Sequence, residues 1–66
     1  MFVTIENHLS YKSAFASLVM WWADGVFDPS YQHQPRIIED VDGEYMLQVH
    51  NDDPSLSWIL EQRNMK

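Results

Sequence analysis

Two runs that contain β-branched and other apolar residues, 36–41 and 44–49, flank Asp42-Gly43, and this pattern constrains the fold more than any other part of the chain. Asp-Gly between such runs is a strong signal for a β-hairpin closed by a two-residue type I′ turn. We therefore expect strands at 36–41 and 44–49, in a register that places Ile38 opposite Leu47. The face expected to cover the core carries Ile38, Tyr45, Leu47 and Val49.

A helix is expected before the hairpin, at about residues 10–24. Ser10 is a candidate N-cap, and Gly25 stands where a C-terminal cap is expected. The apolar residues with the spacing of one helix face are Tyr11, Ala14, Phe15, Leu18 and Trp22. Residues 26–35 contain prolines and show no periodicity, so they are expected to form a loop.

Two shorter segments complete the order of elements. Residues 2–5, Phe-Val-Thr-Ile, are aromatic and β-branched, which favours a strand. Asp53 followed by Pro54 is a start signal for a second helix, with Asp53 as its N-cap. The expected order is β-α-β-β-α.

The length of the chain limits it to one domain, 1–66, with a small core. A domain of this size buries only about 60% of the surface that its unfolded chain exposes. The sequence has no cysteine, which excludes disulfides and thiolate metal sites. The simplest fold class is α+β, with a three-stranded, largely antiparallel sheet and two helices on one face.

Negative charge is concentrated in the C-terminal two thirds of the chain. The formal net charge is −6, and nine of the ten acids lie between Asp24 and Glu61. Arg36 is the only Lys or Arg in that stretch, so its formal charge is −8. Such a surface repels nucleic acid and attracts basic protein surfaces. Direct binding of DNA or RNA is therefore rejected, and a basic protein surface is the expected partner.

Six acids are candidate partner-binding residues. They are Glu39, Asp40, Asp42 and Glu44 around the hairpin, and Asp52 and Asp53 at the start of the second helix. Carboxylates fixed on a rigid surface can imitate the phosphates of a nucleic acid. The alternative is structural: Asp42 makes the turn, Asp53 caps the helix, and the others form a solvated face.

The segment 18–22 is apolar around the whole circumference of the expected helix. This is typical of a helix that is covered on more than one side. Met20, Trp21 and Trp58 are therefore candidates for an interface, with a homodimer as the simplest assembly. The alternative is that Trp21 packs within the chain, under the loop or against Trp58.

Catalysis, metal binding and cofactors are not expected. The histidines His8, His33 and His50 are far apart in sequence, and no serine lies in a nucleophile motif. The segment 40–44 lacks the distal ligands of a calcium loop. The longest apolar run is too short to cross a bilayer, so no membrane association is expected and the predicted location is cytoplasmic.

Charge and apolar surplus lead to two hypotheses about function. The first is a non-enzymatic inhibitor or modulator of a nucleic-acid-handling protein, of the kind that phages and mobile elements use against nucleases or CRISPR complexes, acting through its acidic surface. The second is a self-associating structural or adaptor module that uses the exposed aromatic patch.

Overall fold

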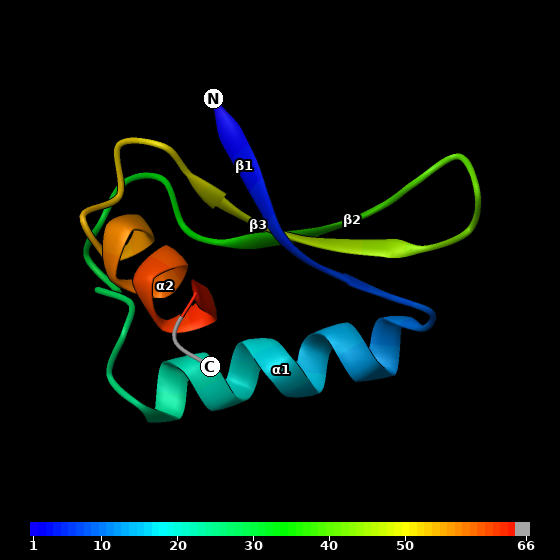
Figure 1. Ribbon diagram of the computed structural model, residues 1–66, viewed down its shortest axis with the longest axis horizontal. Coiled ribbons are helices and arrows are strands. Elements are labelled where there is room, and N and C mark those ends of the chain that lie inside the picture. The colour runs from blue at the N-terminus through cyan, green and yellow to red at the C-terminus, as the bar shows by residue number, and fades with distance from the viewer. Residues whose placement is uncertain (65–66) are drawn as a thin grey trace.

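The computed structural model describes residues 1–64 and confirms the α+β class and the expected order of elements. The elements are β1 (Phe2–His8), α1 (Tyr11–Ala23), β2 (Arg36–Glu39), β3 (Tyr45–His50) and α2 (Ser55–Asn64). The sheet is antiparallel throughout, with strand order β1-β3-β2. Both helices lie below the sheet in Figure 1, so one face of β3, the central strand, rests on the helices.

The hairpin between β2 and β3 differs from the expected one by a single residue of register. Ile37, not Ile38, lies opposite Leu47. The Asp40 N–H donates to the Glu44 carbonyl, and the Gly43 N–H donates back to the Asp40 carbonyl. This closes a three-residue loop, 41–43, in which a type I turn is followed by a left-handed residue.

The new register corrects the expected core face, because a one-residue shift moves every side chain of a strand to the other face. Ile37 packs against the core, and the prediction of Ile38 for that role was wrong. Leu47 and Val49 are fully buried as expected. The sequence offered two adjacent isoleucines, and either could fill the position in β2.

The buried core is small and draws on most elements. It consists of Ile5, Phe27, Leu47, Val49 and Ile59. Phe27 comes from the segment expected to be only a loop, and its ring packs edge-on against Trp22. The loop after α1 therefore contributes to the core as well as connecting the elements.

The buried face of α1 is rotated from the expected stripe. Ser10 caps the helix as predicted, and its hydroxyl accepts the Ser13 N–H. Ala14 is fully buried, but Tyr11 and Phe15 remain about half exposed. Their place is taken by Trp21, which packs against the core from the opposite flank.

A β-bulge in β1 decides which of its side chains face the helices. Thr4 lies opposite Gln48 and Glu6 lies opposite Leu47, so Ile5 is an extra residue. Beyond the bulge the alternation of faces is reversed. Glu6 and His8 therefore share the face of Leu47 and Tyr45, toward α1, where an unbroken strand would point them away.

Candidate functional site

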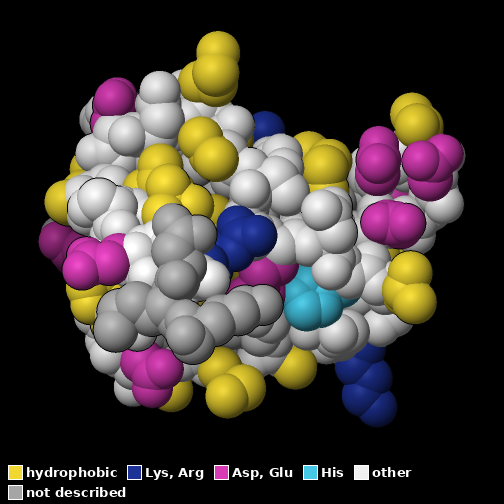
Figure 2. All heavy atoms as spheres, in the orientation of Figure 1, with side chains coloured by type: hydrophobic (Ala, Val, Ile, Leu, Met, Phe, Trp, Pro, Cys, Tyr) yellow, Lys and Arg dark blue, Asp and Glu magenta, His cyan; other side chains and the backbone are white. Residues whose placement is uncertain are grey.

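Four of the six candidate acids lie together at the hairpin tip, which we define as residues 39–44. The tip projects from the right of the molecule in Figure 1, and Figure 2 shows its acidic side chains gathered there. They are Glu39, Asp40, Asp42 and Glu44. Val41 stands among them with 97% of its surface exposed.

The tip carboxylates are not neutralised within the part of the chain that the structure describes. The ion pairs within 4.0 Å in residues 1–64 involve only histidines, His8 with Glu6 and His50 with Asp52. Asp40 alone has a local role, since its side chain accepts the Val41 N–H at 2.7 Å. Glu39 and Asp42 are exposed, and Glu44 is half-buried.

The remaining two candidates, Asp52 and Asp53, lie at the opposite end of β3 from the tip. Asp53 is buried and its side chain accepts the Ser55 N–H at 2.9 Å, which confirms its predicted capping role. Asp52 is exposed, 3.7 Å from the His50 ring. The six acids thus do not form one continuous surface.

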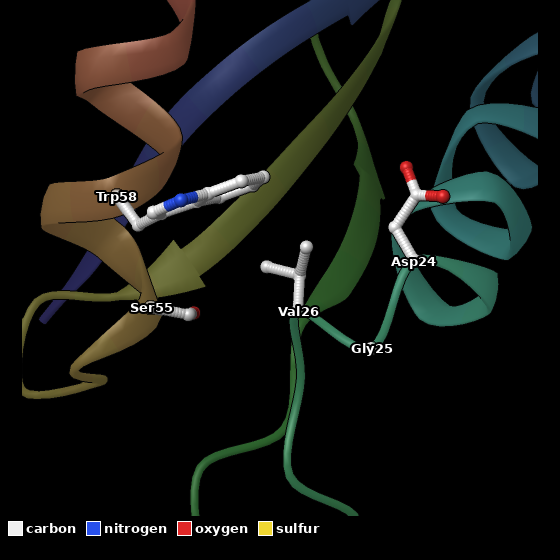
Figure 3. A pocket seen from close by; sticks show the side chains of 5 residues that line it. All are labelled: Asp24, Gly25, Val26, Ser55 and Trp58. Carbon is white, nitrogen blue, oxygen red and sulfur yellow. The ribbon is translucent and has the colours of Figure 1, made fainter.

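Trp21 and Trp58 meet inside the chain, as the intramolecular alternative predicted. Their rings are edge to face, with centroids 6.1 Å apart. Trp58 extends from α2 over the segment that follows α1 (Figure 3) and stays 44% exposed. Met20 is 69% exposed and lines a hollow together with Trp21. Trp21 therefore lies between the other two candidate interface residues, in contact with Trp58 and beside Met20.

A different apolar surface runs along α1. We call it the α1 flank and define it by four side chains between 48% and 69% exposed: Tyr11, Phe15, Val19 and Met20. The Tyr11 ring stacks on Phe15 and touches Tyr45 edge-on. Lys12 is the single charged residue of the helix. Nothing in the described residues covers this flank.

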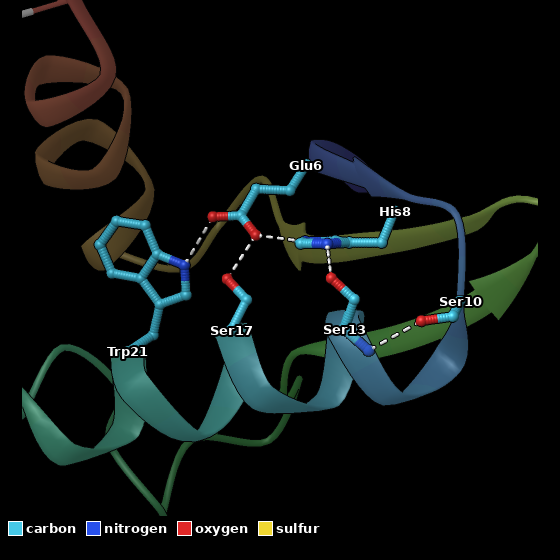
Figure 4. A network of polar contacts seen from close by, with 6 residues as sticks. All are labelled: Glu6, His8, Ser10, Ser13, Ser17 and Trp21. Atoms are coloured by element: carbon cyan, nitrogen blue, oxygen red, sulfur yellow. Dashed lines mark hydrogen bonds and ion pairs between the residues drawn. The ribbon is translucent and has the colours of Figure 1, made fainter.

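Glu6 and His8 take part in a polar network between β1 and α1 that the sequence analysis missed (Figure 4). The Glu6 carboxylate accepts hydrogen bonds from the Ser17 hydroxyl, from His8 Nε2 at 2.7 Å and from the Trp21 indole N–H at 3.0 Å. Burial by itself raises the pKa of Glu6, but these hydrogen bonds outweigh it and hold the pKa below its usual value.

The network also engages both nitrogens of the His8 ring. His8 Nε2 lies 2.7 Å from the Glu6 carboxylate and can donate to it, and Nδ1 lies 2.8 Å from the Ser13 hydroxyl oxygen. Serine, histidine and carboxylate in this order form the relay of many hydrolases. However, the neighbouring hollow of about 250 Å³ is lined by Glu6, Ser17, Met20, Trp21 and Asp24, and does not reach Ser13.

The Ser13 backbone N–H is also engaged, by Ser10, so it is not free to bind an oxyanion. The arrangement satisfies buried polar groups and ties β1 to α1. We therefore interpret it as a structural network. Its sequence signal was the spacing of Ser13, Ser17 and Trp21 at every fourth residue of α1, with Glu6 and His8 two residues apart.

The other two histidines meet on the sheet face that the helices leave open. The rings of His33 and His50 are stacked with centroids 4.0 Å apart, and the Met1 amine lies 2.8 Å from His50 Nε2. Burial lowers the pKa of His50, and the positive charges of His33 and the amine lower it further. Within residues 1–64 no group of three or more potential ligands is placed to hold a metal ion.

Comparisons with protein-family models, with curated proteins and with solved structures found no match to this chain. None of the described helices has the length and apolar character required to cross a membrane.

Proposed function

We propose that this domain is a non-enzymatic binding protein whose hairpin tip contacts a basic surface of another protein. The observation that supports the proposal is the cluster of four carboxylates around the exposed Val41, without a Lys or Arg partner in the described chain. A basic partner would supply the missing countercharges, and Val41 would add apolar contact at the centre of the interface.

The class of partner follows from the charge. Basic surfaces that recognise an array of anionic groups are typical of proteins that handle nucleic acids. Carboxylates at the tip would occupy positions that phosphates otherwise take, and so would compete with the nucleic acid. An inhibitor or modulator of such a protein, of the phage or mobile-element type, is the function that this geometry favours.

The experiment is a capture assay with charge-matched variants. The tip variant carries Glu39→Gln, Asp42→Asn and Glu44→Gln. The control variant removes three exposed acids elsewhere, with Asp28→Asn, Asp52→Asn and Glu61→Gln. We expect nucleic-acid-binding proteins from a bacterial extract to be retained by the wild type and the control but not by the tip variant.

The partner captured in this way is then purified for affinity measurements at low and high salt. Binding through the tip is expected to weaken as salt rises, because salt screens charges that remain near solvent. An affinity independent of salt, or an equal loss in the control variant, would show that the tip is not the binding surface.

The α1 flank favours a second candidate function, self-association. A buried aromatic side chain contributes about 150–250 Å². The four side chains of the α1 flank are about half exposed, so they could bury about 400 Å² of surface per protomer. A standard interface buries about 800 Å² per protomer. We expect a weak dimer, visible by sedimentation at high concentration and abolished by Phe15→Glu with Met20→Glu. Leu60→Glu, an exposed apolar position on α2, is the control and should leave the dimer intact.

A further inference from the structure

A hollow of about 240 Å³ lies between the end of α1 and the start of α2, and we call it the α1–α2 hollow (Figure 3). Its walls are Asp24, Gly25, Val26, Ser55 and Trp58. Sites for drug-sized ligands occupy about 300–1,000 Å³. The α1–α2 hollow is smaller, so it suits a ligand of a few heavy atoms or a single side chain. It belongs neither to the hairpin tip nor to the α1 flank.

The electrostatics of this hollow favour a cation. Asp24 stands on one wall, and no Lys, Arg or His of residues 1–64 lies within 4.0 Å of its carboxylate. The helix α1 ends at Ala23, so the negative end of its macrodipole is directed here. Many helices carry a basic residue in their last turn, but α1 has none.

Trp58 provides an aromatic wall opposite Asp24. Its ring extends over Val26 with one face toward the hollow (Figure 3), and its edge-to-face contact with Trp21 holds it there. A cation over the face of an indole is attracted by the ring quadrupole, and Trp is the best of the aromatic residues for this contact. The stem of an alkylammonium can pack on the same ring.

Ser55 supplies an independent observation at this hollow. Its hydroxyl oxygen is buried and has no hydrogen-bond partner within residues 1–64. Buried hydroxyls in folded proteins almost always have one. The Ser55 side chain points from the first turn of α2 into the space beside Val26 (Figure 3), and a rotation of its hydroxyl toward the hollow would let its oxygen accept an N–H.

We propose that the α1–α2 hollow binds an ammonium group carried on a short apolar stem. Asp24 pairs with the charge, and the Trp58 ring covers the cation and its stem. The Ser55 hydroxyl rotates toward the hollow and its oxygen accepts one ammonium hydrogen. The same chemistry is found in a free alkylamine and in the lysine side chain of a protein partner.

The test is a titration of the ¹⁵N-labelled protein with n-butylammonium chloride, followed by NMR. We expect saturable shifts of the Trp58 indole N–H and of the Gly25 and Ser55 amides, with a Kd on the order of millimolar, as for other partly exposed cation contacts. Sodium chloride and n-butanol, which lack the ammonium group, should leave these signals in place.

Two charge-matched variants separate a specific site from general attraction. Asp24→Asn is expected to weaken binding about fivefold, since it removes one exposed ion pair. Asp52→Asn removes the same charge outside the hollow and should leave the Kd unchanged. Absence of saturable shifts, or equal weakening by both variants, would overturn the proposal.

The source of the ammonium group is distinguished with a second probe, Nα-acetyl-lysine methylamide. Similar affinity for both probes identifies a lysine side chain as a suitable occupant, whereas binding of n-butylammonium alone identifies a free amine. Either outcome supports an ammonium site. Failure of the site leaves the hairpin-tip proposal unaffected, because the tip acids lie at the other end of β3 from α2.

Discussion

Glu6 differs from the other acids of residues 1–64 because three side chains donate hydrogen bonds to its carboxylate. Its side chain is 24% exposed and accepts three hydrogen bonds from side chains. Glu6→Gln places an amide NH₂ against one of these donors, which leaves at least one hydrogen bond unmade. We expect a loss of about 1–3 kcal/mol in the free energy of unfolding, measured in urea by tryptophan fluorescence.

Glu39→Gln is the matched control, because it makes the same chemical change at an exposed position of the hairpin tip. Exposed substitutions of this kind usually stay within about 0.5 kcal/mol. Equal effects of the two substitutions would mean that the hydrogen bonds to Glu6 add nothing to the free energy of unfolding beyond the effect of its negative charge.

The pKa of Glu6 also predicts a dependence of stability on pH. Because its pKa is lowered in the folded state, the contribution of Glu6 is complete above the ordinary value, about 4.3. It is lost as the pH falls through the folded value. The free energy of unfolding, measured by urea between pH 7 and pH 3, should fall less steeply for Glu6→Gln than for the wild type.

His50 predicts a second pH effect, at higher pH. Burial lowers its pKa in the folded state, as do the charges of His33 and the amine, whereas Asp52 and Asp53 act in the opposite direction. The folded protein therefore favours neutral His50. The contribution of His50 to the free energy of unfolding should be fully present above about pH 6.5, the ordinary pKa of histidine. It should be lost as the pH drops from there through the folded pKa.

The measurement for His50 is an NMR titration of its ring protons, together with unfolding curves at several pH values. His50→Gln removes the titrating group and should flatten the stability curve between pH 7 and pH 5. A ring that titrates at or above the ordinary histidine pKa would contradict the stacked arrangement with His33.

Among the elements, strands β3 and β1 show what the sequence could and could not predict. The alternation in β3 identified Leu47 and Val49 correctly, because a central strand places its apolar residues on one face. The bulge at Ile5 was not predictable, since no residue of β1 requires it. The Glu6 network depends on that bulge, so the network was missed as well.

The hairpin was predicted in position but not in register. Asp42-Gly43 is compatible with both a two-residue and a three-residue loop, because each needs a glycine with positive φ. Gly43 has φ +83°, and a Cβ built on it would meet nothing within 4 Å. The constraint at this position is therefore one of backbone conformation alone.

Gly43→Ala is expected to cost about 1–2 kcal/mol, the penalty of a left-handed conformation for an L-residue. Gly43→Asn should cost less, because asparagine tolerates this region better. Urea unfolding of both variants provides the measurement. An alanine variant as stable as the wild type would mean that the loop can adopt another conformation without loss.

For the molecule as a whole, composition predicted the charge but not its division into separate surfaces. The six acids singled out from sequence are split because β3 separates the tip from the α2 start, and this distance depends on strand pairing. Trp21 and Trp58 were expected to be either paired or exposed. The edge-to-face contact between the two rings, one from each helix, decided for pairing, and that contact has no local signal in the sequence.

The net charge of −6, without Lys or Arg pairs to the carboxylates of residues 1–64, predicts that salt stabilises this fold. The molecule spans 30 × 29 × 21 Å. At about 0.01 M salt the Debye length is about 30 Å, so carboxylates repel one another across the whole domain, whereas at about 0.1 M it is about 10 Å.

We expect the free energy of unfolding to rise by about 1 kcal/mol or less over this range of salt, because compaction brings the charges together. The variant with Glu39→Gln, Asp42→Asn and Glu44→Gln should show a shallower rise, since half of the net charge is gone. Urea unfolding at the two salt concentrations compares the slopes. Stability that falls as salt is added would show that attractive pairs outweigh the repulsion, and the tip would then not be an unneutralised surface.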